Sequence, residues 1–402
     1  MAGAFSVSEV YITISHYILS TIKVSLPTGE LKLSLAASDF ELNNLTAYAA
    51  RQNPKRGFMF VSKLLAKYWP SQPAEMLGMH QYLAQALAQS ICGSSVFIGM
   101  AEAAAGLGQG VYEAYLENPV HHEHLFIHTS RYYLEAIKFV DFQEQHSHAS
   151  QFYLYIPQEP PLNSIFLNAQ TLVLIDDEVT TGTTFVNLIS AYQQVNPHLQ
   201  RVLIVSILNF VDPARQSHIQ ESLGVDVVFI NALSAQIHFE QNETYQYTQI
   251  PNVNSKVECK RQNLSLSAGR LGVQGKISWD KTVLQSLIQT WQDNEKILVL
   301  GTGEFVHLAF LVGLYLEQHH WNVKVQSTAR SPLLKGEAIQ EKIILQDNYA
   351  DNIPNYLYNV HEGQYDHIII CHETPLCSPL TQFAQRLNAD LLYYADGKIS
   401  LS

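Results

Sequence analysis

One short segment, residues 172–184, brings together side chains that could do chemistry: it reads LVLIDDEVTTGTT. Its apolar start, Leu172–Ile175, indicates a buried strand, and the residues after it have the spacing of an amphipathic helix. Between strand and helix lie an acidic step and a hydroxyl-rich turn. The acidic step consists of Asp176, Asp177 and Glu178, and the hydroxyl-rich turn consists of Thr180, Thr181, Gly182, Thr183 and Thr184.

This order of strand, acidic step, hydroxyl-rich turn and helix predicts a phosphate-binding site. Backbone N–H groups at a helix N-terminus point at a bound anion, and threonine hydroxyls add further donors. Gly182 has no Cβ, so the backbone can approach the anion closely. Asp176 and Asp177 would not bind phosphate, but they suit sugar hydroxyls or a magnesium shell. An ordinary strand followed by an Asp/Thr helix cap is the alternative, and the complete ordered string favours the phosphate site.

A second candidate segment follows the apolar run Ser95–Ile98 and consists mainly of small residues, with a helix expected to begin near Glu102. Small side chains let backbone amides reach an anion, although a tightly packed strand-to-helix turn has the same composition. The candidate residues of this loop are Met100, Ala101, Glu102, Ala103 and Ala104.

Cations and histidines lie between these two segments, among them Arg131. His146 and His148 could contact an anion or transfer a proton, because imidazole titrates near neutrality. The chain has 17 histidines, so a chance pair is the alternative. The run HHEH at residues 121–124 lacks metal-ligand spacing and is predicted to be a solvated loop. The basic run NPKRG at residues 53–57 fits an anion contact and an ordinary loop equally well.

Two polar segments close predicted strands in the second half of the chain. The run ILVLGTGEF is a strand followed by a Gly-x-Gly turn, which without a third glycine is a weak sign of dinucleotide binding. The run TARSP places a guanidinium beside hydroxyls, which suits carboxylate or phosphate recognition; a plain turn ended by proline is the alternative. The candidate residues of these two segments are Gly301, Gly303, Glu304, Arg330 and Ser331.

The predicted strands and helices alternate, which indicates an α/β fold with a mainly parallel sheet and flanking helices. Ligands of such sheets bind at the carboxyl ends of the strands, where Asp176 falls. Residues 1–60 are expected to be an N-terminal accessory segment, and residues 61–245 the main domain. The polar stretch 246–280 is expected to be a linker, followed by a smaller α/β domain over residues 281–402.

The composition is that of a globular protein, since 47% of the 402 residues are hydrophobic and 15% are charged. The formal net charge is −12 and there is no basic tract, which argues against nucleic acid as a partner. The four cysteines are scattered, which indicates reduced thiols, not a disulfide framework. We recognise neither a signal sequence nor an apolar run of membrane-spanning length, so we expect a cytoplasmic protein without a membrane partner.

Together these segments resemble the type I phosphoribosyltransferases, which use 5-phosphoribosyl 1-pyrophosphate (PRPP). The resemblance is to the orotate-phosphoribosyltransferase-like proteins with a C-terminal TRSP domain, found in bacterial tellurite-resistance and stress gene clusters. It rests on the segments GMAEAAAGLGQGVYEA, HTSRY, EQHSHA, VLIDDEVTTGTT, GTGEF and TARSP. The resemblance implies a phosphoribosyltransferase-type sheet with flanking helices, a smaller α/β TRSP domain and, as in relatives, a possible homodimer.

The family's site implies a role for each candidate segment. Asp176 and Asp177 would contact the ribose hydroxyls, while Glu178 and residues 180–184 would complete the ribose and 5-phosphate site. The loop 100–104 and Arg131 would hold the pyrophosphate, with His146 and His148 as further contacts or proton carriers. Mg²⁺ would arrive with the substrate, without direct protein ligands, and the second domain would contribute the acceptor side or a lid.

The expected function is Mg²⁺-dependent transfer at the ribose C1 position, with PRPP as donor or a nucleotide-like product in the reverse direction. The acceptor would be a small molecule that the sequence does not identify. Two alternatives stay open: a module that senses PRPP or a nucleotide without chemistry, and a hydrolase of ribosyl phosphates.

Overall fold

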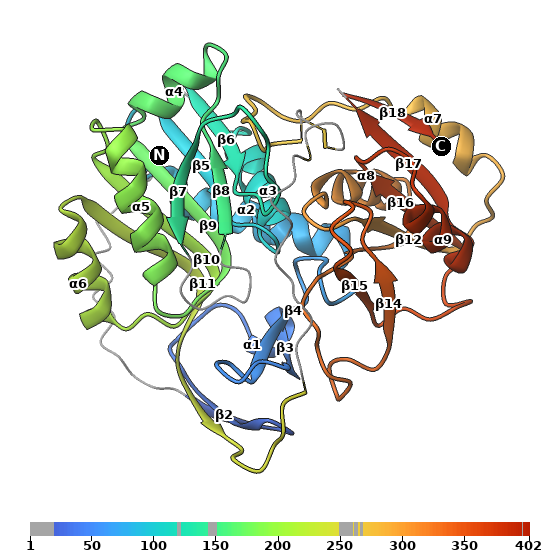
Figure 1. Ribbon diagram of the computed structural model, residues 1–402, viewed down its shortest axis with the longest axis horizontal. Helices are drawn as coiled ribbons and strands as arrows, with labels where there is room; N and C mark the ends of the chain where they lie inside the picture. The colour runs from blue at the N-terminus through green and yellow to red at the C-terminus, as the bar shows by residue number, and fades with distance from the viewer. Residues whose placement is uncertain are drawn as a thin grey trace, which may run out of the picture.

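The structure is a computed structural model that describes residues 20–118, 122–143, 151–248, 260, 264–265, 268–395 and 397–402. Figure 1 shows two α/β units side by side, one coloured from blue to yellow and the other from orange to red. The first unit is built on a seven-stranded sheet. Its strands, in sheet order, are β1 (Ser20–Leu26), β2 (Gly29–Leu35), β11 (Asp226–Gln241), β10 (Arg201–Asn209), β9 (Thr171–Val179), β5 (Ser95–Gly99) and β6 (His124–His128).

The five strands from β11 to β6 are parallel, and this confirms the predicted fold class. Their central residues are buried on both faces, as the continuous apolar run Leu172–Ile175 illustrates. Helices cover both sides of the sheet (Figure 1): α2 (Pro73–Ala88) and α3 (Ala105–Tyr115) lie toward the second unit, and α5 (Thr183–Val195) and α6 (Pro213–Leu223) lie on the opposite side. This unit also contains α4 (Leu162–Asn168).

The described part of the N-terminal segment belongs to this first unit. The β1–β2 hairpin extends the sheet, because β2 pairs antiparallel with the last residues of β11, Ala235–Gln241. After the short helix α1 (Leu42–Leu45), strands β3 (Thr46–Ala50) and β4 (Phe58–Ser62) form a second hairpin. A third hairpin joins β7 (Phe139–Gln143) to β8 (Gln151–Tyr155).

The second unit is a smaller α/β structure, as predicted. In its five-stranded sheet, the central strands are parallel and the last one is antiparallel. These strands, in sheet order, are β13 (Asn322–Ser327), β12 (Lys296–Gly301), β16 (His367–His372), β17 (Asp390–Ala395) and β18 (Lys398–Leu401). The remaining elements are α7 (Thr282–Ile288), α8 (His307–Gln318), α9 (Ser378–Leu387) and the hairpin of β14 (Lys342–Gln346) and β15 (Pro354–Tyr358).

The two units are joined by direct packing and by backbone pairing. Helix α8 of the second unit contacts α2 and α3 of the first. Isolated β-bridges connect Arg51 with Leu333 and Ser71 with Val325. Part of the expected linker also pairs with the first unit, since Phe126 and Val273 exchange N–H···O bonds of 3.0 and 2.8 Å. Within the described part of the chain, no helix combines the length and the apolarity that a bilayer crossing requires.

The structure differs from the predicted elements at three places. Strand β9 continues beyond Ile175 to Val179, because residues 176–179 still pair with β10. Helix α3 begins at Ala105 and not near Glu102, so the small-residue loop is a true loop. The loop predicted at residues 121–124 ends earlier, because His124 is the first residue of β6, buried and hydrogen-bonded to Ser95 Oγ at 2.7 Å.

Candidate active site

A cavity of about 530 Å³ lies at the carboxyl ends of β5 and β9, where the two units meet. The predicted acidic step and hydroxyl-rich turn, residues 176–184, form one wall. Residues 100–103 and Arg131 form another, and residues 330–332 reach it from the second unit. The structure therefore brings candidate residues from four distant segments of the sequence to one cavity.

The hydroxyl-rich turn leads into α5 in the way that anion binding requires. Gly182 occupies the position before the first helical residue with φ of +71°, in the left-handed region that favours glycine. Gly182 has no side chain with which to cap this helix, and the N–H of Thr183 makes only a long hydrogen bond of 3.4 Å, to Thr181 Oγ1. The first-turn N–H groups of α5, together with the threonine hydroxyls, can therefore donate to a phosphate at the cavity wall.

Gly182→Ala is expected to weaken binding of ribose 5-phosphate, since the added Cβ would lie 2.8 Å from Ile219 Cδ1 and the positive φ strains any L side chain. The change should also lower the free energy of unfolding by about 1–3 kcal/mol. Gly224→Ala is the matched control: Gly224 has φ of +65° but nothing within 4 Å of the added Cβ. Calorimetric titration of both variants checks this; equal affinities would contradict a phosphate site at the turn.

The small-residue loop is hydrogen-bonded to β9 and to the residue that follows β6, the two strands on either side of β5. Met100 N–H donates to Ile175 O at 3.0 Å, and Ala101 N–H donates to Thr129 Oγ1 at 2.8 Å. Ala104 N–H donates back to Met100 O, so three of the five candidate amides are already bonded. Among the described residues, the N–H groups of Glu102 and Ala103 have no acceptor, which leaves these two amides for a ligand.

The run NPKRG, for which the sequence favoured neither interpretation, contributes to the cavity through Lys55 and Arg56. Arg56 Nη2 lies 2.6 Å from Glu178 Oε1, and its guanidinium lies 4.7 Å from the ring centroid of Phe58. The other carboxylate oxygen of Glu178 is buried without a hydrogen bond from any described residue. One oxygen of this carboxylate is thus held by arginine and the other is available to a cation or hydroxyl.

The sequence analysis missed several residues that line the cavity, among them Arg51 and Tyr68. The backbone of Arg51 forms an isolated β-bridge with Leu333 of the second unit. The Arg51 guanidinium forms no ion pair with a described carboxylate. Burial lowers the pKa of this guanidinium, which means that its charge is not fully compensated. An uncompensated cation in the wall favours an anionic ligand.

Two carboxyl groups of the acidic step, those of Asp177 and Glu178, have raised pKa values. Burial raises the pKa of Asp177 above its ordinary value, and burial together with the neighbouring Asp177 raises that of Glu178 in spite of Arg56. When the pKa of an acid is higher in the folded than in the unfolded protein, ionisation of that acid destabilises the fold. The stability then falls as the pH rises through the pKa. A bound cation or hydroxyl donors at the cavity would offset this cost of ionisation.

Asp177→Asn is therefore expected to raise the melting temperature at neutral pH. Below the pKa of an unfolded aspartate both proteins carry a neutral side chain, so the difference should vanish there and grow as the pH rises. Thermal unfolding measured at several pH values checks this, with the exposed Asp293→Asn as control. A variant that is less stable than the wild type at neutral pH would contradict the assignment.

The second-domain candidates divide into two groups. Arg330 and Ser331 line the cavity. Gly301, Gly303 and Glu304 form a tight turn at the contact between the units, where a Cβ on Gly301 would lie 2.4 Å from Phe305 O. The buried Glu304 accepts from Ser130 Oγ at 2.8 Å and from Arg131 N–H at 2.6 Å. This Gly-x-Gly turn thus holds the two units together.

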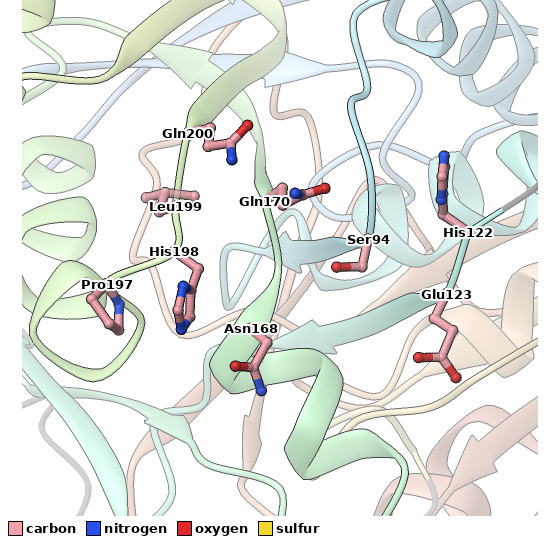
Figure 2. Close-up of a pocket in the computed structure, with 9 residues that line it drawn as sticks. All are labelled: Ser94, His122, Glu123, Asn168, Gln170, Pro197, His198, Leu199 and Gln200. Atoms are coloured by element: carbon pink, nitrogen blue, oxygen red, sulfur yellow. The ribbon is translucent and has the colours of Figure 1, made fainter.

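A larger hollow of about 980 Å³ lies at the opposite, amino end of the parallel strands. Figure 2 shows its side chains on separate loops, with His198 on one side, His122 and Glu123 on the other, and Gln170 between them. Ligands of parallel sheets bind at the carboxyl ends, and none of the predicted site residues lines this hollow. The smaller cavity is therefore the candidate site.

The predicted pair His146 and His148 lies outside the described residues. Their suggested part in pyrophosphate contact or proton transfer stays a prediction. The hairpin of β7 and β8 contributes Phe152 to the cavity, and the Arg131 guanidinium lies 4.1 Å from the centroid of that ring.

Comparison with solved structures finds phosphoribosyltransferases of low sequence identity. Adenine phosphoribosyl transferase from Trypanosoma brucei, in complex with AMP, pyrophosphate and ribose 5-phosphate, is 14% identical; the match covers 54% of this chain and 87% of that one, with a TM-score of 0.34. Orotate phosphoribosyltransferase from Mycobacterium tuberculosis H37Rv is 14% identical over 46% and 89% of the two chains, with a TM-score of 0.27. Orotate phosphoribosyltransferase from Francisella tularensis is 15% identical; the match covers 47% of this chain and 82% of that one, with a TM-score of 0.29.

Comparison with protein families is more specific, although a search of the curated proteins finds no match. A family model described as phosphoribosyl transferase matches residues 45–236, which contain the acidic step, the hydroxyl-rich turn and the small-residue loop. A second model, described as the TRSP domain C-terminal to that transferase, matches residues 267–387 of the second unit. The chain therefore belongs to the family of phosphoribosyltransferases that carry a C-terminal TRSP domain, and it is an enzyme of that class.

Proposed function

We propose that the protein transfers a phosphoribosyl group from PRPP to a small acceptor, or runs the reverse reaction, and so makes or processes a nucleotide-like molecule. The observation that carries this proposal is one cavity that joins paired carboxylates, a helix N-terminus with glycine at the N-cap position and a loop with two unbonded amides. PRPP has a part for each: ribose hydroxyls, a 5-phosphate and a pyrophosphate.

The reaction would break the bond between ribose C1 and the pyrophosphate oxygen, which keeps the bonding electrons. A nucleophilic atom of the acceptor would form the new bond to C1 and release its proton. Positive charge develops on the ribose ring during such a displacement, and the carboxylates of Asp176 and Asp177 would stabilise it. Binding of the 5-phosphate at residues 180–184 would hold C1 in position, so that remote binding energy lowers the barrier.

The oxygen donors around the cavity fit magnesium that arrives with the substrate. Glu178 has a buried oxygen without a hydrogen bond from the described residues, and burial raises the pKa of the adjacent Asp177. Both features indicate negative charge that a divalent cation would balance. When bound, Mg²⁺ would neutralise the pyrophosphate as it leaves.

The remaining cavity wall fits an acceptor with an apolar face. Phe58 and Met59 of β4 and Ile237 and Phe239 of β11 also line the cavity. A flat ring could pack against these apolar side chains. These side chains support a small organic acceptor as the partner.

The proposal is tested by incubating the protein with PRPP, Mg²⁺ and a panel of nucleobases and related heterocycles. Pyrophosphate release that needs an acceptor and equals the new glycoside in amount is the expected result. Bound PRPP that stays unchanged with every acceptor would instead support a sensing module. Hydrolysis of PRPP without transfer to any acceptor would support a hydrolase.

A further inference from the structure

The small-residue loop has an unusual charge for a pyrophosphate site. Residues 100–104 include no lysine or arginine, and their only charged side chain, Glu102, lines the cavity. An unbalanced carboxylate would repel a pyrophosphate, and the repulsion is strong where water is excluded. A pyrophosphate can bind at this loop only if cations from elsewhere balance Glu102.

Two cations from outside the loop lie beside Glu102. Lys67 Nζ is 2.5 Å from Oε1, and Arg330 Nε, which belongs to the second unit, is 3.6 Å from Oε2. Burial favours the neutral acid, but these two cations outweigh it, so the pKa of Glu102 lies below its ordinary value. The carboxylate is therefore charged and balanced across the contact between the units.

The two cations differ in what else they contact. Lys67 Nζ also donates to Gly303 O at 2.8 Å and to Thr328 O at 2.7 Å, so its three N–H groups are directed at protein acceptors. Lys67 does not line the cavity, whereas Arg330 does. Arg330 is thus the cation of this pair that can meet a ligand.

Groups from both units fix the position of the Arg330 guanidinium. It lies 4.9 Å from the ring centroid of Tyr132, and Nη2 lies 3.6 Å from Asp351 Oδ2. Tyr132 in turn stacks on Tyr349 of the second unit at 4.4 Å between centroids. The side chain is only 6% exposed, and it lines the cavity.

We infer that the second domain completes the pyrophosphate subsite, with Arg330 as the residue that binds the pyrophosphate of PRPP. This inference rests on the proposed function. A guanidinium can donate two parallel N–H bonds to a phosphate and balances the charge that the pyrophosphate gains when the C1–O bond breaks. Glu304 acts as a positioning residue, since it holds the backbone of Arg131 beside the same subsite.

The test compares two ligands that differ only in the pyrophosphate. Mg²⁺-PRPP and ribose 5-phosphate are titrated into the full-length wild type and into Arg330→Gln and Arg330→Lys. We expect Arg330→Gln to weaken PRPP binding by about tenfold or more while ribose 5-phosphate binding stays within about twofold. Arg330→Lys, which keeps the charge without the planar fork, should recover part of the loss.

Ribose 5-phosphate binding also shows whether the variant site is folded, so a structural effect is recognised by an equal loss for both ligands. That result, or unchanged PRPP binding, would overturn the inference. Arg386→Gln is the matched control, because Arg386 is an exposed arginine of α9 in the same domain. A wild type that does not bind PRPP at all would refute the proposed function itself.

Glu102→Gln separates ligand binding from ion pairing. If Arg330 serves the pyrophosphate, removing the carboxylate should tighten PRPP binding, since a negative charge leaves the subsite. If Arg330 serves only as the partner of Glu102, the loss of either residue should weaken PRPP binding equally. The second outcome would overturn the inference.

Discussion

Replacement of both Asp176 and Asp177 by asparagine is expected to abolish PRPP binding without lowering the melting temperature. Hydrogen bonds to charged groups contribute about 1.5–3 kcal/mol each, so the loss of two corresponds to roughly 10²–10⁴ in affinity. Stability should be kept or increased, because burial raises the pKa of Asp177 and the fold therefore gains from a neutral side chain there. Function and stability thus oppose each other at this position.

Titration calorimetry with Mg²⁺-PRPP and thermal unfolding of the same samples measure the two effects. Asp293→Asn, at an exposed turn away from the cavity, is the control and should change neither. A double variant that binds PRPP like the wild type would show that these two carboxylates do not contribute to PRPP binding. A large fall in melting temperature would assign them a structural part instead.

Arg270→Met should produce the largest loss of stability in the molecule. Arg270 is fully buried between the units, with two N–H···O bonds of 2.6 Å to Glu373 and one of 3.2 Å to Glu304. Removing the guanidinium would leave two buried carboxylates without their counter-ion, which costs about 3–5 kcal/mol. Because Glu304 also holds Ser130 and Arg131, PRPP binding should weaken as well.

Chemical denaturation and thermal unfolding check this prediction. Lys276→Met is the matched control, because it breaks an ion pair with Glu117 whose side chains are 49% and 52% exposed; such surface pairs contribute about 0–1 kcal/mol. Combining Arg270→Met with Glu304→Gln and Glu373→Gln should recover part of the lost stability. Arg270→Met with wild-type stability would show that the buried ion pairs do not hold the units together.

The parallel sheet and the segment 172–184 could be predicted because their signals are local. An apolar run followed by acidic residues, a hydroxyl-rich turn and helical spacing is readable in one window of sequence. The end of β9 was predicted too early, at Ile175, because charged residues interrupt the apolar pattern. The ladder to β10 nevertheless continues, with Ser206 opposite Asp176 and Leu208 opposite Glu178.

Which cations pair with which carboxylates of the site could not be predicted, since this depends on contacts between distant segments. Arg56 meets Glu178 across 122 positions, and Lys67 meets Gly303 across 236. The sequence suggested anion recognition at Arg330 but had no means of placing it beside Glu102. The linker prediction for residues 246–280 used polarity and glycine content, which do not reveal that Val273 pairs with β6.

Titration of PRPP into the purified wild-type protein, with and without Mg²⁺, tests the central claim most directly. We predict one binding site per chain, with an affinity that depends on Mg²⁺ and exceeds that for ribose 5-phosphate. Absence of PRPP binding in the presence of Mg²⁺ would contradict the account, and the cavity would then have to serve another ribosyl phosphate.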